Sequence, residues 1–361
     1  MPEIHAARRR RAQEFVAQAG ADAALITVGP NVRYLTGLAS SNAALLLPAD
    51  GDRALLATDS RYAGAARRDA PDLELLEDRF IEAKLAAEAA SRGIKRLAFE
   101  AHEMTVERHG QFTAKAEGVT TLPFGRRIEE LRQVKDGTEL DKLAEACRLT
   151  DAALARVLPQ IRPGMSEREL ATLLDHTMAL LGAQRPAFDT IVASGPNGAI
   201  PHHAPTTREL ARGDLVTMDF GALHEGYHAD MTRTVAIGAV ADWQREVYYL
   251  VALAQEAGIA VLEDGVEAGT VDAAAREVIE AAGHAAHFQH GLGHGVGLEI
   301  HEAPMLGYGR TGKLTDRVPV TVEPGVYLPG RGGVRIEDVL VVTAGDRARF
   351  LTSTTRELLV L

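Results

Sequence analysis

The most informative stretch of this chain is Gly291-Leu292-Gly293-His294-Gly295-Val296-Gly297-Leu298-Glu299-Ile300-His301-Glu302. It sets one histidine inside a run of alternating glycines and a second histidine seven residues later. Alone, such a run is a weak signal, because glycine-rich segments also form ordinary loops and phosphate-binding loops. The run does not form a Gly-x-Gly-x-x-Gly motif with a downstream acid, so it gives no support to a nucleotide site. Its meaning therefore depends on the acidic residues before and after it.

Two similar segments lie on either side of this stretch, at an offset of 104 residues: Val216-Thr217-Met218-Asp219-Phe220-Gly221 and Val320-Thr321-Val322-Glu323-Pro324-Gly325. Each is an apolar run that ends in an acid, one further residue and a glycine. Each is followed by a loop and a second β-rich run with another acid, which is Asp230 in the first case and Glu337 in the second. Neighbouring strands of a hairpin bring their side chains next to each other. We therefore expect these four carboxylates to face one space.

The repeated pattern predicts that residues 127–361 form a duplicated α/β unit whose two halves meet at this space. Helical runs at about 166–181 and about 270–282 precede the two hairpins in the same order. The site would thus be built from equivalent parts of both halves.

The charge of such a cluster predicts bound metal. Four carboxylates packed together cannot all ionise unaided, because like charges raise one another's pKa. Two divalent cations would balance them, and oxygen-rich ligation with a single imidazole suits Mn²⁺, with Co²⁺ or Zn²⁺ also acceptable. Two such cations, roughly 3.5–4 Å apart, lower the pKa of a shared water from about 15.7 towards 7. The pattern therefore indicates a two-metal hydrolase that attacks a carbonyl group.

Each acid also has an ordinary interpretation. Asp219 alone would be a turn residue at the end of a strand, and Asp230 alone could pair with Arg233. Glu337 and Asp338 are adjacent, so on a strand they point to opposite faces and only one can be a ligand. What argues against these interpretations is that five separate patterns occur together and in order.

These segments resemble the pita-bread metallopeptidases, a family that includes methionine aminopeptidase, aminopeptidase P, prolidase and the metal-free creatinase. The resemblance implies that Asp219 is a terminal ligand of one metal and that His294 and Glu323 bind the other. Asp230 and Glu337 would bridge the two metals. It further implies that the roles beyond metal binding fall to four residues: oxyanion and substrate contacts to His202 and His301, proton transfer to Glu323, and orientation of a carboxylate to Arg335. His202 is preferred over the adjacent His203 from its motif, Asn197-Gly198-Ala199-Ile200-Pro201-His202.

The first part of the chain is expected to be a separate α/β domain. Its predicted elements are a helix, Ile81–Ser91, and four strands, Ala23–Thr27, Ala43–Leu47, Arg53–Ala57 and Arg96–Phe99. Residues 1–126 resemble the N-terminal domain shared by creatinase, prolidase and aminopeptidase P, and the boundary is placed in the segment Pro123–Gln133. In that family the domain takes part in a dimer contact, so the resemblance implies a homodimer.

Composition sets wider limits. The chain has 361 residues, 46% hydrophobic and 25% charged, which is typical of a soluble globular protein. A net charge of −11 argues against general binding of nucleic acid. The single cysteine excludes an internal disulfide and suits a reducing cytoplasm. No apolar run is long enough to predict a membrane span.

The family implies cleavage before proline, whose imide nitrogen carries no N–H and whose ring holds φ nearly constant. Prolidases cleave only Xaa-Pro dipeptides and resemble one another in a His-Glu-x-Pro-Arg sequence, whereas this chain has Met305 in place of the arginine. A thioether cannot bind the proline carboxylate, so we expect an aminopeptidase P that uses a hydroxide shared by the two metals. The alternatives are a prolidase, in which Arg310 or Arg331 would replace that arginine, a creatinase-like amidinohydrolase, and a non-catalytic binding protein of the same fold. The complete ligand set argues against the last two.

Overall fold

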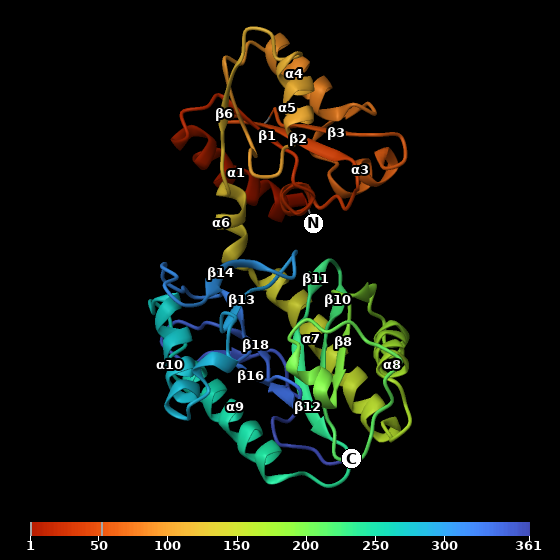
Figure 1. The fold of residues 1–361 in the computed structure, drawn as a ribbon. Helices are drawn as coiled ribbons and strands as arrows, with labels where there is room; N and C mark the ends of the chain where they lie inside the picture. Colours follow the sequence, from red (N-terminus) through yellow and green to blue (C-terminus); the bar gives the residue numbers. More distant parts are fainter. Residues whose placement is uncertain (1, 52) are drawn as a thin grey trace. The chain divides into compact units, whose positions relative to one another are not determined.

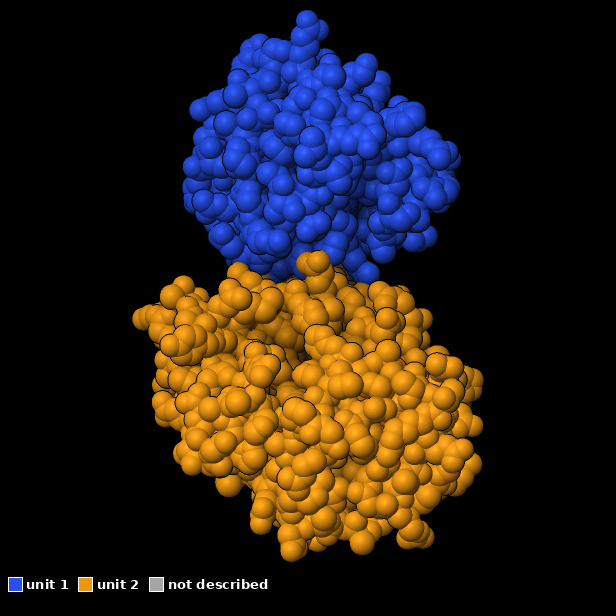
Figure 2. All heavy atoms as spheres, in the orientation of Figure 1, with its two compact units in different colours: residues 1–132 blue, residues 133–361 orange. Residues whose placement is uncertain are grey.

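The structure is a computed structural model that describes residues 2–51 and 53–361. The chain divides into two compact units, Met1–Arg132 and Gln133–Leu361, which Figure 2 shows in separate colours. The boundary expected between 126 and 127 lies at the start of helix α6, Arg127–Gln133, whereas the two units divide between Arg132 and Gln133.

The first unit is built on one six-stranded mixed sheet with the order β4-β3-β2-β1-β5-β6. Strand β1 pairs antiparallel with β2 and parallel with β5. The expected helix coincides with α4 residue for residue, and the four expected strands agree with β1, β2, β3 and β5 to within two residues at either end. Its elements are α1 Pro2–Gln18, β1 Ala23–Ile26, α2 Gly29–Thr36, β2 Ala43–Pro48, β3 Leu55–Thr58, α3 Ala63–Asp69, β4 Glu74–Glu77, α4 Ile81–Ser91, β5 Arg96–Phe99, α5 Val106–Thr113 and β6 Thr120–Pro123.

The second unit consists of two similar halves (Figure 1). In each half, two long helices lie against small antiparallel sheets. The first half contains α7 Gly137–Val157, α8 Glu167–Leu180, β7 Arg185–Pro186, β8 Ile191–Ser194, β9 Leu215–Phe220, β10 Ala222–His224, β11 Tyr227–His228 and β12 Met231–Ala236. The second contains α9 Asp242–Ala260, α10 Ala268–Ala281, β13 Gly293–Gly295, β14 Glu302–Leu306, β15 Pro319–Val322, β16 Gly325–Leu328, β17 Gly332–Arg335, β18 Asp338–Val341 and β19 Arg349–Phe350.

Helix ends and cores explain why these halves are stable. Helices α7 and α8 both begin with a capping box, in which Asp136 and Ser166 cap the backbone N–H groups of the third helical residue. Leu170 and Leu174 of α8 belong to one buried core with Val216 of β9. In the second half, another buried core joins helices α9 and α10 to the strands. Full burial of one leucine contributes about 1.5–3 kcal/mol, so each helix is held mainly by its apolar face.

The duplicated hairpins are interrupted at the acids. In the first half β9 pairs with β12, and β10 then pairs with β11; in the second half β15 pairs with β18, and β16 with β17. Each hairpin therefore bends once between its two pairs of strands, and the four predicted acids lie at or next to this bend. At one of these points a Cβ on Gly221 would lie 1.8 Å from the carbonyl oxygen of Ala229, so only glycine allows the two strands to approach. The acid-x-Gly pattern thus marks a backbone requirement as well as a ligand.

Among the described residues, none of the helices combines the length and the apolar composition needed to span a membrane.

Candidate metal centre

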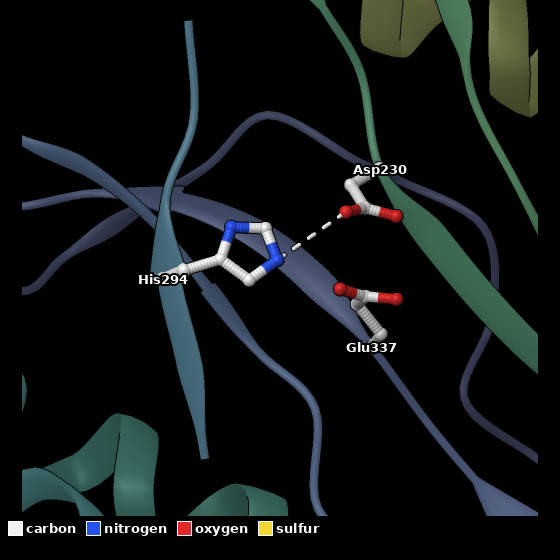
Figure 3. Close-up of side chains that lie close together, drawn as sticks. All are labelled: Asp230, His294 and Glu337. Carbon is white, nitrogen blue, oxygen red and sulfur yellow. Dashed lines mark ion pairs between the residues drawn. The ribbon is translucent and has the colours of Figure 1, made fainter. Parts of the chain in front are cut away.

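Three predicted ligands from three separate segments of the chain meet in the interior of the second unit (Figure 3). One ligand atom each of Asp230, His294 and Glu337 lies within 4.8 Å of the other two. Asp230 directly precedes β12, His294 is the middle residue of β13, and Glu337 lies between β17 and β18. All three side chains are buried.

The backbone orients the imidazole of His294 for metal binding. Its Nδ1 lies 3.0 Å from the carbonyl oxygen of Gly295, to which it can only donate, so Nε2 keeps its lone pair. Nε2 lies 3.6 Å from Asp230 Oδ2 and 3.5 Å from Glu323 Oε1. A Cβ on Gly293 would lie 2.1 Å from the carbonyl oxygen of Thr321, so the glycine before His294 lets β13 lie close to β15. Burial lowers the pKa of His294 to about 4, which keeps the ring neutral as a ligand must be.

Asp219 provides an independent indication of a cation. Arg335 Nη2 donates to its Oδ2 at 2.7 Å. Its Oδ1 is buried and accepts no hydrogen bond from any described residue. A buried carboxylate oxygen without a partner is costly, and a divalent cation would satisfy it. The donor set therefore fits the metal that the sequence predicts.

The remaining acids of the set are Glu323 and Glu337. Val322 pairs with Asp338, which brings Glu323 and Glu337 to the ends of neighbouring strands. Thr232 Oγ1 donates to Glu337 Oε2 at 2.7 Å. Burial, and then repulsion between the carboxylates, raise the pKa of Asp230 and of Glu337 well above the ordinary range, while burial raises the pKa of Glu323 to about 8. The cluster is electrostatically strained without cations, as the sequence predicts.

The ordinary interpretation of Asp230 does not apply in the structure. Arg233 does not pair with Asp230; its Nη2 donates to Asp338 Oδ1 at 2.7 Å. Asp338 also accepts hydrogen bonds from Gln255 at 3.0 Å and from Thr352 at 2.7 Å. Asp338 is therefore fully occupied on the side of the strand away from Glu337, as strand alternation requires.

The two adjacent histidines have different surroundings. His203 is buried, and its Nε2 lies 2.8 Å from Glu167 Oε2, whereas His202 is exposed. His301 is also exposed, and its ring centroid lies 4.4 Å from that of His294, at an interplanar angle of 77°. Loss of hydration, and then the proximity of His202, lower the pKa of His301. His202 and His301 thus lie near each other on the open side of the ligand cluster.

Sequence reasoning assigned no role to Tyr327 and none to His290. Arg335 Nη1 donates to the Tyr327 hydroxyl at 3.0 Å, and this hydroxyl lies 2.8 Å from His290 Nε2. Because His290 Nδ1 donates to the Gly291 carbonyl at 2.8 Å, its Nε2 accepts from the Tyr327 hydroxyl. A continuous chain of hydrogen bonds therefore runs from His290 through Tyr327 and Arg335 to Asp219. The available signal was the position of His290, which directly precedes the glycine run that carries His294.

Four carboxylates and one imidazole are gathered here, with an arginine and two exposed histidines beside them, and this donor set fits divalent metal. Residues 141–344 match the model of a family described as "Metallopeptidase family M24", and residues 8–134 match "Creatinase/Prolidase N-terminal domain". The chain belongs to metallopeptidase family M24. The expected family and fold class, a creatinase-like N-terminal domain followed by a pita-bread catalytic domain, are confirmed.

Relatives match over almost the whole chain. An "Xaa-Pro dipeptidase" of Pyrococcus horikoshii is 34% identical over 348 residues, which cover 96% of this chain and 97% of the relative. The structure of an "Xaa-Pro dipeptidase from Bacillus anthracis" superposes with a TM-score of 0.95 at 35% identity and covers 99% of this chain and 100% of the other. An "X-Pro aminopeptidase from Thermotoga maritima" gives a TM-score of 0.90 at 35% identity, with coverage of 98% and 99%.

Proposed function

We propose that this metallopeptidase is an Xaa-Pro dipeptidase that holds two divalent cations. The observation that carries the proposal is the convergence of Asp230, His294 and Glu337 in one buried space, in a chain similar over its full length to Xaa-Pro dipeptidases. The expectation of an aminopeptidase P, drawn from the sequence, has less support than its alternative, because the dipeptidases form the larger part of the similar proteins.

One observation still favours the aminopeptidase. Met305 pairs with His294 across strands β13 and β14, and its side chain is 38% exposed. A thioether therefore borders the ligand cluster at the position where an arginine would bind the carboxylate of a dipeptide. The Thermotoga maritima X-Pro aminopeptidase, at 35% identity, keeps this second candidate function open to test.

The predicted ligands can be assigned to two cations. Asp219 would hold one, His294 and Glu323 the other, and Asp230 and Glu337 would lie between them. Mn²⁺ is the expected cation, because the set is oxygen-rich with a single imidazole. When bound, the cations would act as Lewis acids towards the scissile carbonyl and supply a nucleophilic water at neutral pH.

The protein side chains then have separate tasks. Glu323, one of the four clustered acids, is suited to accept a proton and pass it to the leaving nitrogen. His202 and His301 lie on the open side, where their N–H groups can donate to the developing oxyanion. Arg335, held by Tyr327 and Thr232, keeps the carboxylate of Asp219 in a single orientation. A proline substrate fits this site because none of these contacts requires an N–H on the scissile nitrogen.

Substrate length tests the proposed function directly. We expect the Mn²⁺-loaded enzyme to hydrolyse Ala-Pro and Met-Pro with a kcat/KM at least about tenfold above that for Ala-Pro-Ala, since tenfold corresponds to one well-made interaction with the terminal carboxylate, about 1.4 kcal/mol. Ala-Ala is the control for the proline requirement. Faster cleavage of Ala-Pro-Ala than of Ala-Pro would make the protein an aminopeptidase, and Met305→Arg should then shift the ratio back towards dipeptides.

Substitution of His202 or His301 should impair catalysis without changing metal binding. His202→Ala and His301→Ala are each expected to keep the metal content of the wild type and to lose about 100- to 1000-fold in kcat, the usual cost of removing one oxyanion donor. Metal content is measured by atomic emission and kcat on the preferred Xaa-Pro substrate. His176→Ala, on the exposed surface of α8, is the matched control. Unchanged kcat in both site variants would assign oxyanion stabilisation to other groups.

A further inference from the structure

One buried carboxylate outside the metal centre has an unusual number of partners. Glu167 is the first residue of α8 and its exposed fraction is 0%. Its Oε1 accepts from Ser194 N at 2.8 Å, Ser194 Oγ at 2.7 Å and Asn197 Nδ2 at 2.9 Å. Its Oε2 lies 2.8 Å from His203 Nε2 and accepts from Thr206 N at 3.0 Å and Thr206 Oγ1 at 2.7 Å. Six donors therefore converge on a single side chain.

All of these donors come from one segment, residues 194–206, which also carries His202. Beyond Ser194, which ends strand β8, this segment has no strand and no helix except the short 3₁₀ helix Gly195–Ala199. His203, which binds Glu167, is the immediate neighbour of His202, and the two side chains face different surroundings, one buried and one exposed. The contact that holds His203 inward therefore turns His202 outward.

The same segment is held from its other side by strand β17. A Cβ on Gly333 would lie 2.2 Å from the carbonyl oxygen of Gly198, so the two backbones are in direct contact. Arg335, at the end of β17, has its Nη1 3.4 Å from the carbonyl oxygen of Pro201. The segment is thus clamped between Glu167 and the strand that leads to Glu337.

We propose that Glu167 is a positioning residue for His202, which it holds beside the metal centre through residues 194–206; the inference rests on the proposed function of His202. A site on an irregular segment needs such support, because functional groups must be held within about 0.5 Å of their working position. An ionised carboxylate matches six donors, whereas an amide would point an NH₂ group at several of them. Charge at this position, and not only shape, is therefore required.

The second half of the unit contains a parallel arrangement. Asp272 of α10 is buried, and its Oδ1 accepts from the backbone N–H of Leu292 at 3.0 Å. Arg276, paired with Asp272, donates to the carbonyl oxygens of Phe288 at 2.9 Å and His290 at 2.8 Å. In both halves a buried acid on the helix before the hairpin thus anchors the segment that carries a site histidine.

Glu167→Gln tests the proposal. We expect kcat to fall about 10- to 100-fold, the range typical of partners that orient a functional side chain, with KM and metal content changed less than twofold. Glu169→Gln is the matched control, because Glu169 lies in the same helical turn, is exposed, and bonds Ser166 at the helix cap without touching residues 194–206. A decrease no larger than that of Glu169→Gln would overturn the proposal.

A double-mutant cycle separates positioning from general structural damage. If Glu167 acts through His202, Glu167→Gln should lower kcat by less than about twofold in a His202→Ala background, because contacting groups that work as a unit are not additive. An equal decrease in both backgrounds would refute the proposal. Should Glu167→Gln fail to fold, Thr206→Val removes one 2.7 Å bond to Oε2 and should lower kcat several-fold with the same dependence on His202.

A measurement that does not depend on enzymatic activity tests the positioning role of Glu167 separately from the proposed function. The imidazole NMR signals of His202, assigned by comparison with His202→Ala, should shift in Glu167→Gln and stay in place in Glu169→Gln. Absence of Xaa-Pro hydrolysis by the wild type would refute the proposed function and leave this measurement valid. An unshifted His202 signal in Glu167→Gln would refute the positioning role whatever the substrate is.

Discussion

Asp230→Ala and Glu337→Ala are each expected to lose both metals and at least about 1000-fold in kcat/KM, because the cations are expected to lower the pKa of the nucleophilic water by several units. The physical reason is position: with His294, these two acids form the group whose ligand atoms approach within 4.8 Å. A carboxylate shared by two cations cannot be removed without weakening both sites. Metal content per chain and kcat/KM are measured on the same preparations after dialysis against Mn²⁺.

Asp242→Ala, an exposed acid at the start of α9, controls for the loss of one negative charge and should behave as the wild type does. Removing a terminal ligand should have a different signature: Asp219→Ala is expected to lose one metal and retain part of the other. A Glu337→Ala enzyme with two metals and near-normal turnover would show that this acid is not a bridging ligand.

In the metal-free protein, the free energy of unfolding should decrease as pH rises from 6.5 to 8. In the metal-free protein the pKa of Glu323 is about 8 and those of Asp230 and Glu337 are raised well above the ordinary range, mainly by burial. Between pH 6.5 and 8 these acids then bind more protons in the folded than in the unfolded state, so the free energy of unfolding falls as pH rises. Burial lowers the pKa values of His290 and His294 to about 4, so these histidines act in the opposite direction, and their effect fades as pH rises above 6.5.

The measurement is the Tm of the metal-free and the Mn²⁺-loaded protein at pH 6.5, 7, 7.5 and 8. The difference in Tm should widen with pH, because the ionised acids repel one another without the cations and bind them when they are present. Glu323→Gln should reduce the pH dependence of the metal-free form, since it removes one of the titrating groups. A metal-free protein that becomes more stable across this interval would contradict the assignment of the acids to one cluster.

The acids and the histidine that meet in the candidate metal centre could be identified in the sequence because their signals are local. An acid, one residue and a glycine at the end of an apolar run describe the point where a hairpin ribbon changes direction, and the close approach at Gly221 shows why the glycine belongs to the pattern. The two-residue period of a strand indicated that only one of Glu337 and Asp338 could be a ligand, and the resemblance to the family selected Glu337. The boundaries of helix α4 and strand β5 were predicted to the residue, since they depend on propensity and apolar periodicity within a few turns of chain.

The sequence by itself therefore determined the family and the succession of a creatinase-like and a catalytic domain, and it singled out the acids and histidines that are proposed for the site. Only the tertiary structure decided how those groups are supported. Glu167 meets residues 194–206, Tyr327 joins His290 to Arg335, and Arg335 binds Asp219 across 116 positions of sequence. Hydrogen bonds of this kind leave no period or spacing in the chain, because they form between elements that come together only when both halves have folded.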